Sequence, residues 1–447
     1  MNKTIITVVS FGTAALLLLS CGSSRRAAVP IAETPLLAEQ PKQTDTLTTG
    51  TIQVGDTISL IDAVKLALDN NPGLKVYYSE IKAREARTWQ ESLLPNPELD
   101  VEMENLFGSG LYKSLNSSET TISLGQLIQL AGKREKRTKV AALQSDLANW
   151  DYEAKRLDVF TEVVSAFTFM LASQERIKVY EELHELATEF VKTISSRVKA
   201  GKISPAELAR AQVELSVTDI ELKRARRELK AARQRLAATW GSVSPEFQSV
   251  KGKLDIPPDI PPLEKLMALI VDNPDLMRWT VEMEERRAVK ELEKARAVPD
   301  PFVRGGYRYL NESKDNAFVV GFSIPLPVFN RNQGAVQEAE YQVRKAEQQR
   351  RTTETSIKTR LAESYQQLSA LYNEAITLKE EIIPDAGEAF EVIKQGYLMG
   401  KFASIDVLVA QRTLFEARVR YLNSLTEFNQ TVADIERLTG HSLANVK

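Results

Sequence analysis

Two stretches of the sequence, GKISPAELARAQ at residues 201–212 and GKFASIDVLVAQ at residues 400–411, align with each other without a gap. Their starts are 199 residues apart, and two glycines at the same spacing, Gly241 and Gly440, follow them. Self-similarity at a fixed period is the signature of a repeated structural unit. The sequence therefore predicts one unit present twice, rather than the two or three unrelated domains that 447 residues would otherwise suggest.

Two further motifs extend the repeat toward the N-terminus. An Asn-Pro pair at residues 71–72 recurs at 273–274, and a Pro-x-Pro motif at residues 95–97 recurs at 299–301. Near-constant spacing at separated places indicates that both units have the same plan from end to end. The predicted organisation comprises a first repeat at residues 57–245, a linker with four prolines at 246–262, a second repeat at 263–441 and a tail at 442–447.

Each unit is predicted to be mainly helical. A short helix stops at the Asn-Pro pair and a second helix stops at the Pro-x-Pro motif, because the residue before a proline is pushed out of the α region. Two strands, a long helix, a Gly-Lys turn and a final helix complete the unit. The predicted helices are 59–70, 73–94, 133–200 and 206–240 in the first repeat, and 263–272, 275–298, 335–383 and 405–439 in the second, with a kink near Pro384 and Gly387.

The long segment at residues 133–200 contains neither Gly nor Pro, and as a single helix it would be about 100 Å long. Its apolar residues step by three or four, a spacing typical of a coiled-coil seam. The pattern predicts that the helix buries one stripe, as an exposed antiparallel hairpin in any coiled-coil protein would also do. The seam residues are Val140, Leu143, Leu147, Trp150, Ala154, Leu157, Phe160, Val164, Phe167 and Leu171.

The composition excludes several classes of function. With 58 basic and 60 acidic residues, the chain has no cationic excess for binding nucleic acid. One cysteine cannot build an internal disulfide framework or a cysteine-based zinc site, and His184 and His441 leave little for a histidine metal centre or catalytic triad. The sequence has no phosphate-binding loop, nucleophile elbow, metal-ligand cluster or dinucleotide-binding motif. We therefore predict no enzymatic activity and no cofactor.

Two segments in each repeat alternate in character along the chain, as half-buried strands do. In the first repeat the segments are 98–104 and 118–124, and in the second they are 303–309 and 318–324. Along these segments Glu98, Asp100, Glu102 and Glu104 alternate with Leu99, Val101 and Met103, and Arg304 and Arg308 alternate with Val303, Tyr307 and Tyr309.

These strands fit two interpretations. They could form a small antiparallel sheet with one face in water, or two transmembrane hairpins whose residues alternate between lipid and lumen. Four strands from one chain cannot close into a barrel, and an open edge in lipid leaves unsatisfied backbone groups. The membrane interpretation therefore requires an oligomer, and three copies would supply twelve strands, enough to enclose a lumen.

The N-terminal stretch MNKTIITVVSFGTAALLLLSC has the features of a secretion signal, with a positive start and a short apolar run. Its end resembles the bacterial lipobox, which implies that Cys21 becomes the mature N-terminus and carries acyl chains. The alternative is an ordinary signal peptide with an accidental cysteine. Gly22 stands where enterobacterial lipoproteins of the inner membrane have aspartate, which favours the outer membrane. The predicted N-terminal segments are a lipoprotein signal peptide at 1–20 and a lipidated tether at 21–56.

Together these features resemble the TolC family of outer-membrane efflux channels over residues 57–441. Two junction motifs, LIQLAGKREKR at 127–137 and IPLPVFNRNQGAV at 324–336, are similar to the heavy-metal (CzcC/CusC-like) branch that works in RND tripartite systems. The resemblance implies a homotrimer in which a twelve-stranded outer-membrane β-barrel continues into a long periplasmic α-helical barrel. It also implies a passive conduit that receives divalent metal cations, or drugs, from an inner-membrane RND-type pump through a periplasmic adaptor.

The resemblance assigns the two Gly-Lys turns, Gly201-Lys202 and Gly400-Lys401, to a periplasmic tip where the coiled coils close the channel. Family gating aspartates fall on Asp406 and Glu207, and a tyrosine of the closing network falls on Tyr397. The sequence departs from the TolC pattern at Val409, where a second aspartate would fall, and at Phe402, where an arginine would fall. An acidic residue just inside a helix start also stabilises the helix dipole, so Glu207 and Asp406 fit capping and gating alike.

If the charged strand positions face a pore, Glu98, Asp100, Glu102 and Glu104 outnumber the two arginines, Arg304 and Arg308. Acidic rings favour cations in channels, so this excess predicts cation passage. The simpler interpretation is a solvated strand face. Two other classes share parts of the pattern: an outer-membrane channel for type I polypeptide secretion and a periplasmic adaptor lipoprotein. An adaptor would have one hairpin flanked by Gly-rich β domains, whereas this sequence predicts two hairpins and two strand pairs.

Overall fold

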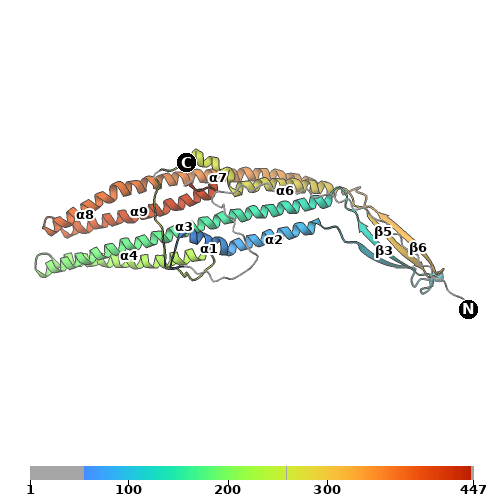
Figure 1. Ribbon diagram of the computed structural model, residues 1–447, viewed down its shortest axis with the longest axis horizontal. Helices are drawn as coiled ribbons and strands as arrows, with labels where there is room; N and C mark the ends of the chain where they lie inside the picture. The colour runs from blue at the N-terminus through green and yellow to red at the C-terminus, as the bar shows by residue number, and fades with distance from the viewer. Residues whose placement is uncertain (1–54, 258, 444–447) are drawn as a thin grey trace. The chain divides into compact units, whose positions relative to one another are not determined.

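The structure is a computed structural model that describes residues 55–257 and 259–443, so Cys21 and the predicted signal peptide lie outside the described residues. Its elements follow the same order in both repeats, as predicted (Figure 1). The first repeat comprises β1 (Thr57–Ile58), α1 (Leu60–Asn70), α2 (Pro72–Ser92), β2 (Glu98–Glu104), the short 3₁₀ helix η2 (Gly110–Tyr112), β3 (Glu119–Leu127), α3 (Lys133–Lys199) and α4 (Pro205–Ala238). The linker contains β4 (Ser249–Val250), which pairs with β1. The second repeat comprises α5 (Leu263–Leu269), the 3₁₀ turn η3 (Ile270–Asp272), α6 (Pro274–Arg296), β5 (Phe302–Leu310), β6 (Asp315–Ser323), α7 (Gln333–Thr377), the π-helical turn η4 (Leu378–Ile382), α8 (Ile383–Leu398) and α9 (Ser404–Thr439).

The Asn-Pro pairs join the start of one helix to the end of another. The Asn71 side chain accepts a hydrogen bond from the Leu74 amide at 3.1 Å and donates one to the Thr239 carbonyl at 2.7 Å. In the second repeat the Asn273 side chain caps α6 and donates to the Leu438 carbonyl at 2.9 Å. Each asparagine is buried, so it satisfies backbone groups that water cannot reach. The motif therefore ties the start of α2 to the end of α4 and the start of α6 to the end of α9, besides starting a helix.

The sequence predicted a regular helix from residue 335 to 383 in the second repeat, but the regular helix is shorter. Regular α-helix ends at Thr377, and the π-helical turn η4 precedes α8. The predicted irregularity near Pro384 therefore exists, but it begins six residues earlier than the proline. Proline has no backbone N–H and its ring crowds the preceding turn, which a local change of helical pitch accommodates.

The predicted single seam on the long helix is wrong in part. Val159, Val163, Ala166 and Met170 are fully buried although none belongs to the predicted seam, while Trp150, Ala154, Phe160 and Val164 are only partly buried. The reason is that α3 has neighbours on several sides, because it packs against α1, α2, α4, α6 and α9 (Figure 1). Within the described residues, no helix is both long and apolar enough to cross a membrane.

The two repeats share one hydrophobic cluster near the Gly-Lys turns. The cluster contains buried residues from four helices, namely Ile194 on α3, Ala211 on α4, Phe390 on α8 and Leu414 on α9. Because the α3–α4 and α8–α9 hairpins both contribute, the two hairpins pack directly on each other near their Gly-Lys turns. This contact brings the predicted tip residues of both repeats together.

The four longer strands form one antiparallel sheet in the order β2-β3-β5-β6. The central pair, β3 and β5, comes from different repeats, and Gly125 lies opposite Arg304 in its register. The outer edges of β2 and β6 have no strand partner among the described residues. The sheet thus joins the two repeats at its centre and leaves one free edge on each side.

Candidate functional site

The sheet has one charged face and one apolar face, as the alternation predicted. The register places the carboxylates of β2 on the same face as Arg304 and Arg308 of β5, because paired residues point to the same side. The opposite face is mostly apolar and exposed, with Thr120, Gln126 and Asn316 as its polar side chains. Its exposed side chains are Leu99, Val101, Met103, Ile122, Leu124, Val303, Tyr307, Tyr309, Phe318, Val320 and Phe322.

The two arginines reach across β3 to half of the predicted acidic residues. Arg304 lies 3.7 Å from the Asp100 carboxylate, and Arg308 lies 3.1 Å from the Glu104 carboxylate. Arg308 also pairs with Glu119 of β3 at 2.8 Å. No ion pair joins Glu98 or Glu102 to a described residue. Glu98 and Glu102 therefore carry unpaired negative charge on this face, while Glu104 and Glu119 share one arginine.

Glu119 is a member of the charged face that the sequence analysis missed. Its carboxylate accepts from Asn105 at 3.2 Å as well as from Arg308. It lies inside the predicted strand segment 118–124, and its side chain is on the same face as that of Thr121, two residues further along. Parity along the strand was thus a usable signal for this residue.

Residues of the junction motif at 127–137 contact the segment that follows α6 and the end of α2. The Lys133 ammonium lies 2.7 Å from the Asp300 carboxylate and also donates to the Val298 carbonyl at the end of α6. The Leu130 amide donates to the same carboxylate at 2.8 Å. The start of α3 in the first repeat is therefore tied to the Pro-x-Pro motif of the second repeat.

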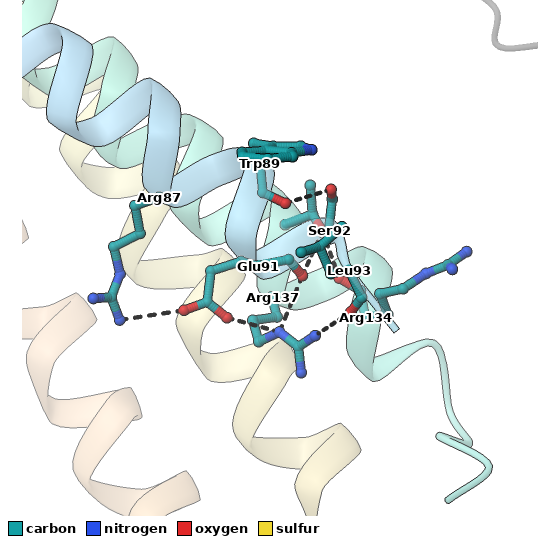
Figure 2. Close-up of polar contacts among 8 residues, drawn as sticks. Arg87, Trp89, Glu91, Ser92, Leu93, Arg134 and Arg137 are labelled. Atoms are coloured by element: carbon teal, nitrogen blue, oxygen red, sulfur yellow. Dashed lines mark hydrogen bonds and ion pairs between the residues drawn. The ribbon is translucent and has the colours of Figure 1, made fainter. Parts of the chain in front are cut away.

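Arg137, from the same motif, closes the end of α2 (Figure 2). Its guanidinium lies 2.7 Å from the Glu91 carboxylate and donates to the Glu91 carbonyl at 3.1 Å and the Leu93 carbonyl at 3.2 Å. The last carbonyls of a helix lack intrahelical partners and carry partial negative charge, so a cation there satisfies both needs. In the second repeat, Asn332 serves α6 similarly by donating to the Glu293 carbonyl at 2.8 Å. These motif residues tie the starts of α3 and α7 to the ends of α2 and α6, from which the chain continues into β2 and β5.

The two Gly-Lys turns connect α3 to α4 and α8 to α9. Gly201 and Gly400 have φ of +68° and +79°, a left-handed conformation that glycine adopts without the steric cost of a Cβ. Lys202 and Lys401 follow them and are exposed. The turns are therefore located as the sequence predicted, at the ends of two adjacent helical hairpins.

Arg197 joins these two ends and was not identified from the sequence. Its guanidinium donates to the carbonyls of Tyr397 at 3.2 Å and Leu398 at 3.0 Å, the last carbonyls of α8. It also lies 4.5 Å from the centre of the Tyr397 ring, within the range of a cation–π contact. The sequence contained one indication that Arg197 differs in role between the repeats, because the equivalent position of the second repeat, 199 residues later, is Gly396.

Gly396 lies directly against the ring of Phe402, which follows in the Gly-Lys turn. A Cβ at Gly396 would lie 2.3 Å from the Phe402 ring, so only glycine leaves room for that ring. The first repeat therefore places an arginine at this position and reaches the second repeat, whereas the second repeat places a glycine and packs its own turn.

The three predicted aperture residues have different surroundings. Tyr397 is buried and packs on Phe190 with ring centres 5.5 Å apart; burial raises the pKa of its phenol, and the nearby Arg197 opposes that rise. Glu207 accepts a hydrogen bond from the Ser404 hydroxyl of the other repeat. Asp406 accepts from the Ala403 amide at 2.8 Å and thus caps its own helix. Glu207 and Tyr397 lie in the contact between repeats, whereas the Asp406 carboxylate bonds locally.

Further polar contacts between the repeats run along α9. Arg412 pairs with Glu214 at 2.7 Å and Arg418 pairs with Glu182 at 2.7 Å. Both pairs are partly exposed, so each is expected to contribute at most about 1 kcal/mol to stability. Across the described ranges, no group of three or more His, Cys, Asp or Glu side chains is placed to hold a metal ion.

Comparison with known proteins connects this arrangement to efflux. A family described as "Outer membrane efflux protein" matches residues 63–242 and 267–441. The chain is similar to the cobalt-zinc-cadmium resistance protein CzcC of Cupriavidus metallidurans, with 35% identity over 383 residues, which cover 86% of this chain and 90% of that protein.

Solved structures share the fold. A CusC crystal structure has a TM-score of 0.72 at 14% identity and covers 88% of this chain and 96% of that one. The outer membrane protein VceC of Vibrio cholerae also has a TM-score of 0.72, at 18% identity, over 86% of this chain and 96% of that one. The matches span both repeats.

Proposed function

Because the chain belongs to the outer membrane efflux protein family, we propose that three copies form the outer-membrane channel of a tripartite pump. The observation that carries this proposal is the two-faced sheet with free edges. In lipid, each unsatisfied backbone group at an edge costs several kcal/mol, so four strands require partners. Three copies supply twelve strands, which can enclose a lumen lined by the charged face, with the apolar face toward lipid.

The channel would be passive. Energy and most substrate selection would come from an inner-membrane RND-type pump, and a periplasmic adaptor would dock on the helical tips formed by α3–α4 and α8–α9. Acyl chains on Cys21 would hold the N-terminus at the outer membrane, and more than one chain is needed for stable anchoring. With this role the protein would be a conduit and not an enzyme.

Divalent metal cations are the substrate class that we propose. The support is the similarity to a protein named for cobalt, zinc and cadmium resistance, together with the carboxylates on the charged face of the sheet. An acidic lumen raises the local concentration of cations and disfavours anions. Export of drugs or of polypeptides would use the same fold, so substrate must be decided by experiment.

A strain that lacks this gene but keeps its pump and adaptor is expected to lose tolerance to cobalt, zinc or cadmium by roughly tenfold in inhibitory concentration, because substrate could no longer leave the periplasm. Growth would be measured across metal concentrations and, in parallel, across hydrophobic drugs, with the restored gene as control. Unchanged metal tolerance combined with new drug sensitivity would contradict the proposed substrate class and support the drug alternative. Loss of a secreted polypeptide alone would support the secretion alternative.

Neutralising Glu98 and Glu102 together is expected to reduce cation selectivity. These carboxylates lack an ion-pair partner among the described residues, so E98Q/E102Q removes uncompensated charge from the lumen face. The cation-to-anion permeability ratio, taken from the reversal potential in a potassium chloride gradient, should fall roughly twofold or more. The matched control E98D/E102D keeps the charge and should retain the ratio. Equal ratios for all three proteins would show that this face does not line the pore.

A further inference from the structure

The Gly-Lys turns at the ends of the two helical hairpins lie in stretches that carry positive charge and no carboxylate. Residues 192–204, around the turn between α3 and α4, contain four basic residues and no Asp or Glu. Residues 392–405, around the turn between α8 and α9, contain two basic residues and again no Asp or Glu. The whole chain, by contrast, has a formal net charge of −2, so positive charge is concentrated at these turns.

Four of these six cations have no ion-pair partner among the described residues. Of the other two, Arg197 donates to the Tyr397 and Leu398 carbonyls, and Lys394 lies 3.4 Å from the Glu391 carboxylate. The four that remain are exposed lysines, namely Lys192, Lys199, Lys202 and Lys401.

The carboxylates that follow the turns do not neutralise these lysines. Glu207 accepts a hydrogen bond from the Ser404 hydroxyl and lies 3.9 Å from Arg210. Asp406 accepts from the Ala403 amide at 2.8 Å. The first carboxylate of α4 and the first carboxylate of α9 are therefore engaged elsewhere, and the lysine charges stay uncompensated within the described chain.

Helix dipoles do not account for the turn lysines either. Lys202 and Lys401 occupy equivalent positions of the two repeats, 199 residues apart. Each lies between the end of one helix and the start of the next. The partial negative charge of a helix C-terminus and the partial positive charge of the next N-terminus oppose each other there, so a cation gains little from either. A charge that stabilises nothing inside the chain is available to a partner.

Exposed apolar side chains accompany the lysines in the second repeat. Leu398, Met399 and Phe402 are 50%, 70% and 42% exposed, and Lys401 lies between the last two in the sequence. Protein interfaces combine an apolar core with a polar rim, and methionine adapts its shape to a partner. Because Arg197 ties the end of α3 to the end of α8, both turns contribute to one surface. We call this the tip surface, and it comprises Lys199, Lys202, Leu398, Met399, Lys401 and Phe402.

We propose that the tip surface binds an acidic surface of the periplasmic adaptor, on which Asp and Glu side chains surround apolar residues. The inference rests on the proposed function, which places an adaptor at these tips, and it adds the chemistry of the partner. Charge pairs at the rim of an interface act mainly on the association rate and its dependence on salt. Burial of Met399 and Phe402 would add affinity that does not depend on charge.

A membrane surface is the other anionic partner that a cationic and apolar patch can bind. The helix α3 has 67 residues and therefore extends about 100 Å from Lys133, which follows the sheet, to Lys199 at the turn. Lipid around the proposed membrane-facing sheet is too far from the tip surface to be its partner. An acidic protein surface is thus the occupant that the structure favours.

Removal of charge from the tip surface tests the proposal. The full-length channel in detergent would carry K199Q/K202Q/K401Q, and its association with the purified adaptor of the same transport system would be followed by biolayer interferometry from about 50 to 300 mM sodium chloride. The matched control K230Q/K251Q/K253Q removes three exposed lysines from the other half of α4 and from the linker. The single variants K202Q and K401Q repeat the measurement with one charge removed per copy.

The association rate of the unaltered protein is expected to fall roughly tenfold from low to high salt. The rate of K199Q/K202Q/K401Q at low salt should be roughly tenfold lower and nearly independent of salt, whereas the control should match the unaltered protein. Equal rates and salt dependence for the triple variant and the unaltered protein would overturn the acidic partner and leave adaptor docking in place. Absence of adaptor binding by the unaltered protein would overturn the proposed tripartite assembly as well. If the unaltered protein instead bound phosphatidylglycerol vesicles and the triple variant did not, the tip surface would be a membrane contact.

Discussion

Replacing Val320 by arginine is expected to block insertion of the channel into the outer membrane. Val320 is 84% exposed on the apolar face of β6, and a charge at mid-depth on the lipid face of a barrel costs about 2–4 kcal/mol. In a trimer the cost is incurred three times and reaches about 6–12 kcal/mol, which is comparable to the about 5–15 kcal/mol by which a typical protein is folded. The measurement is the fraction of protein recovered as heat-modifiable oligomer in the outer-membrane fraction, which should fall by roughly tenfold or more.

The adjacent residue provides a matched control. Val319 is half-buried on the charged face of the same strand, opposite Gly306. Val319→Arg therefore adds the same side chain on the lumen side, where water and carboxylates can stabilise it. Recovery of this variant should be close to that of the unaltered protein. Equal recovery of Val320→Arg and Val319→Arg would contradict the assignment of the two faces to lipid and lumen.

Arg197→Ala is expected to produce a channel that opens far more readily at the tips. Arg197 ties the two helical hairpins by donating to two carbonyls at the end of α8 and by lying over the Tyr397 ring. Hydrogen bonds from a charged donor contribute about 1.5–3 kcal/mol each when shielded, and partial exposure reduces their sum here to about 2 kcal/mol. If the contact exists only in the closed state, its loss raises the open-to-closed ratio by about 30-fold for each copy in the channel.

Single-channel recording in planar bilayers measures this ratio. Arg197→Lys keeps the charge but cannot hold two carbonyls with one planar group. Its open-to-closed ratio should therefore lie between those of Arg197→Ala and the unaltered protein. Arg418→Ala removes a partly exposed ion pair between the repeats elsewhere on α9 and should leave the open-to-closed ratio unchanged. A closed Arg197→Ala channel, indistinguishable from the unaltered protein, would show that this contact does not hold the tips together.

Much of the fold was accessible from the sequence because backbone constraints are local. The Asn-Pro and Pro-x-Pro motifs stop helices wherever they occur, so the predicted helix ends agree with α1, α2 and α6 to within a few residues. Strand alternation likewise placed Glu98, Asp100, Glu102 and Glu104 on one face together with Arg304 and Arg308, which the register confirms. In both cases the signal lies in the residues themselves.

Features that depend on distant neighbours were not accessible. Which faces of α3 are buried depends on the five other helices that pack against it. Val159 and Met170 are apolar and buried, but the sequence alone did not place them in the predicted seam. Arg197 lies 200 residues from the tyrosine that it covers, and one sequence does not reveal such pairing. The asparagines of the Asn-Pro pairs were recognised as helix boundaries, but their second bond, to the end of a distant helix, was not.

The central claim is that three copies of this duplicated chain close into one channel. The mass of the intact protein in detergent, measured by native mass spectrometry with chemical cross-linking as an independent check, tests it most directly. The account predicts a single species at three times the mass of one processed chain, which dissociates to monomers on denaturation. A monomer or a dimer as the main species would contradict it, because neither one nor two copies supply the twelve strands from which the channel is argued.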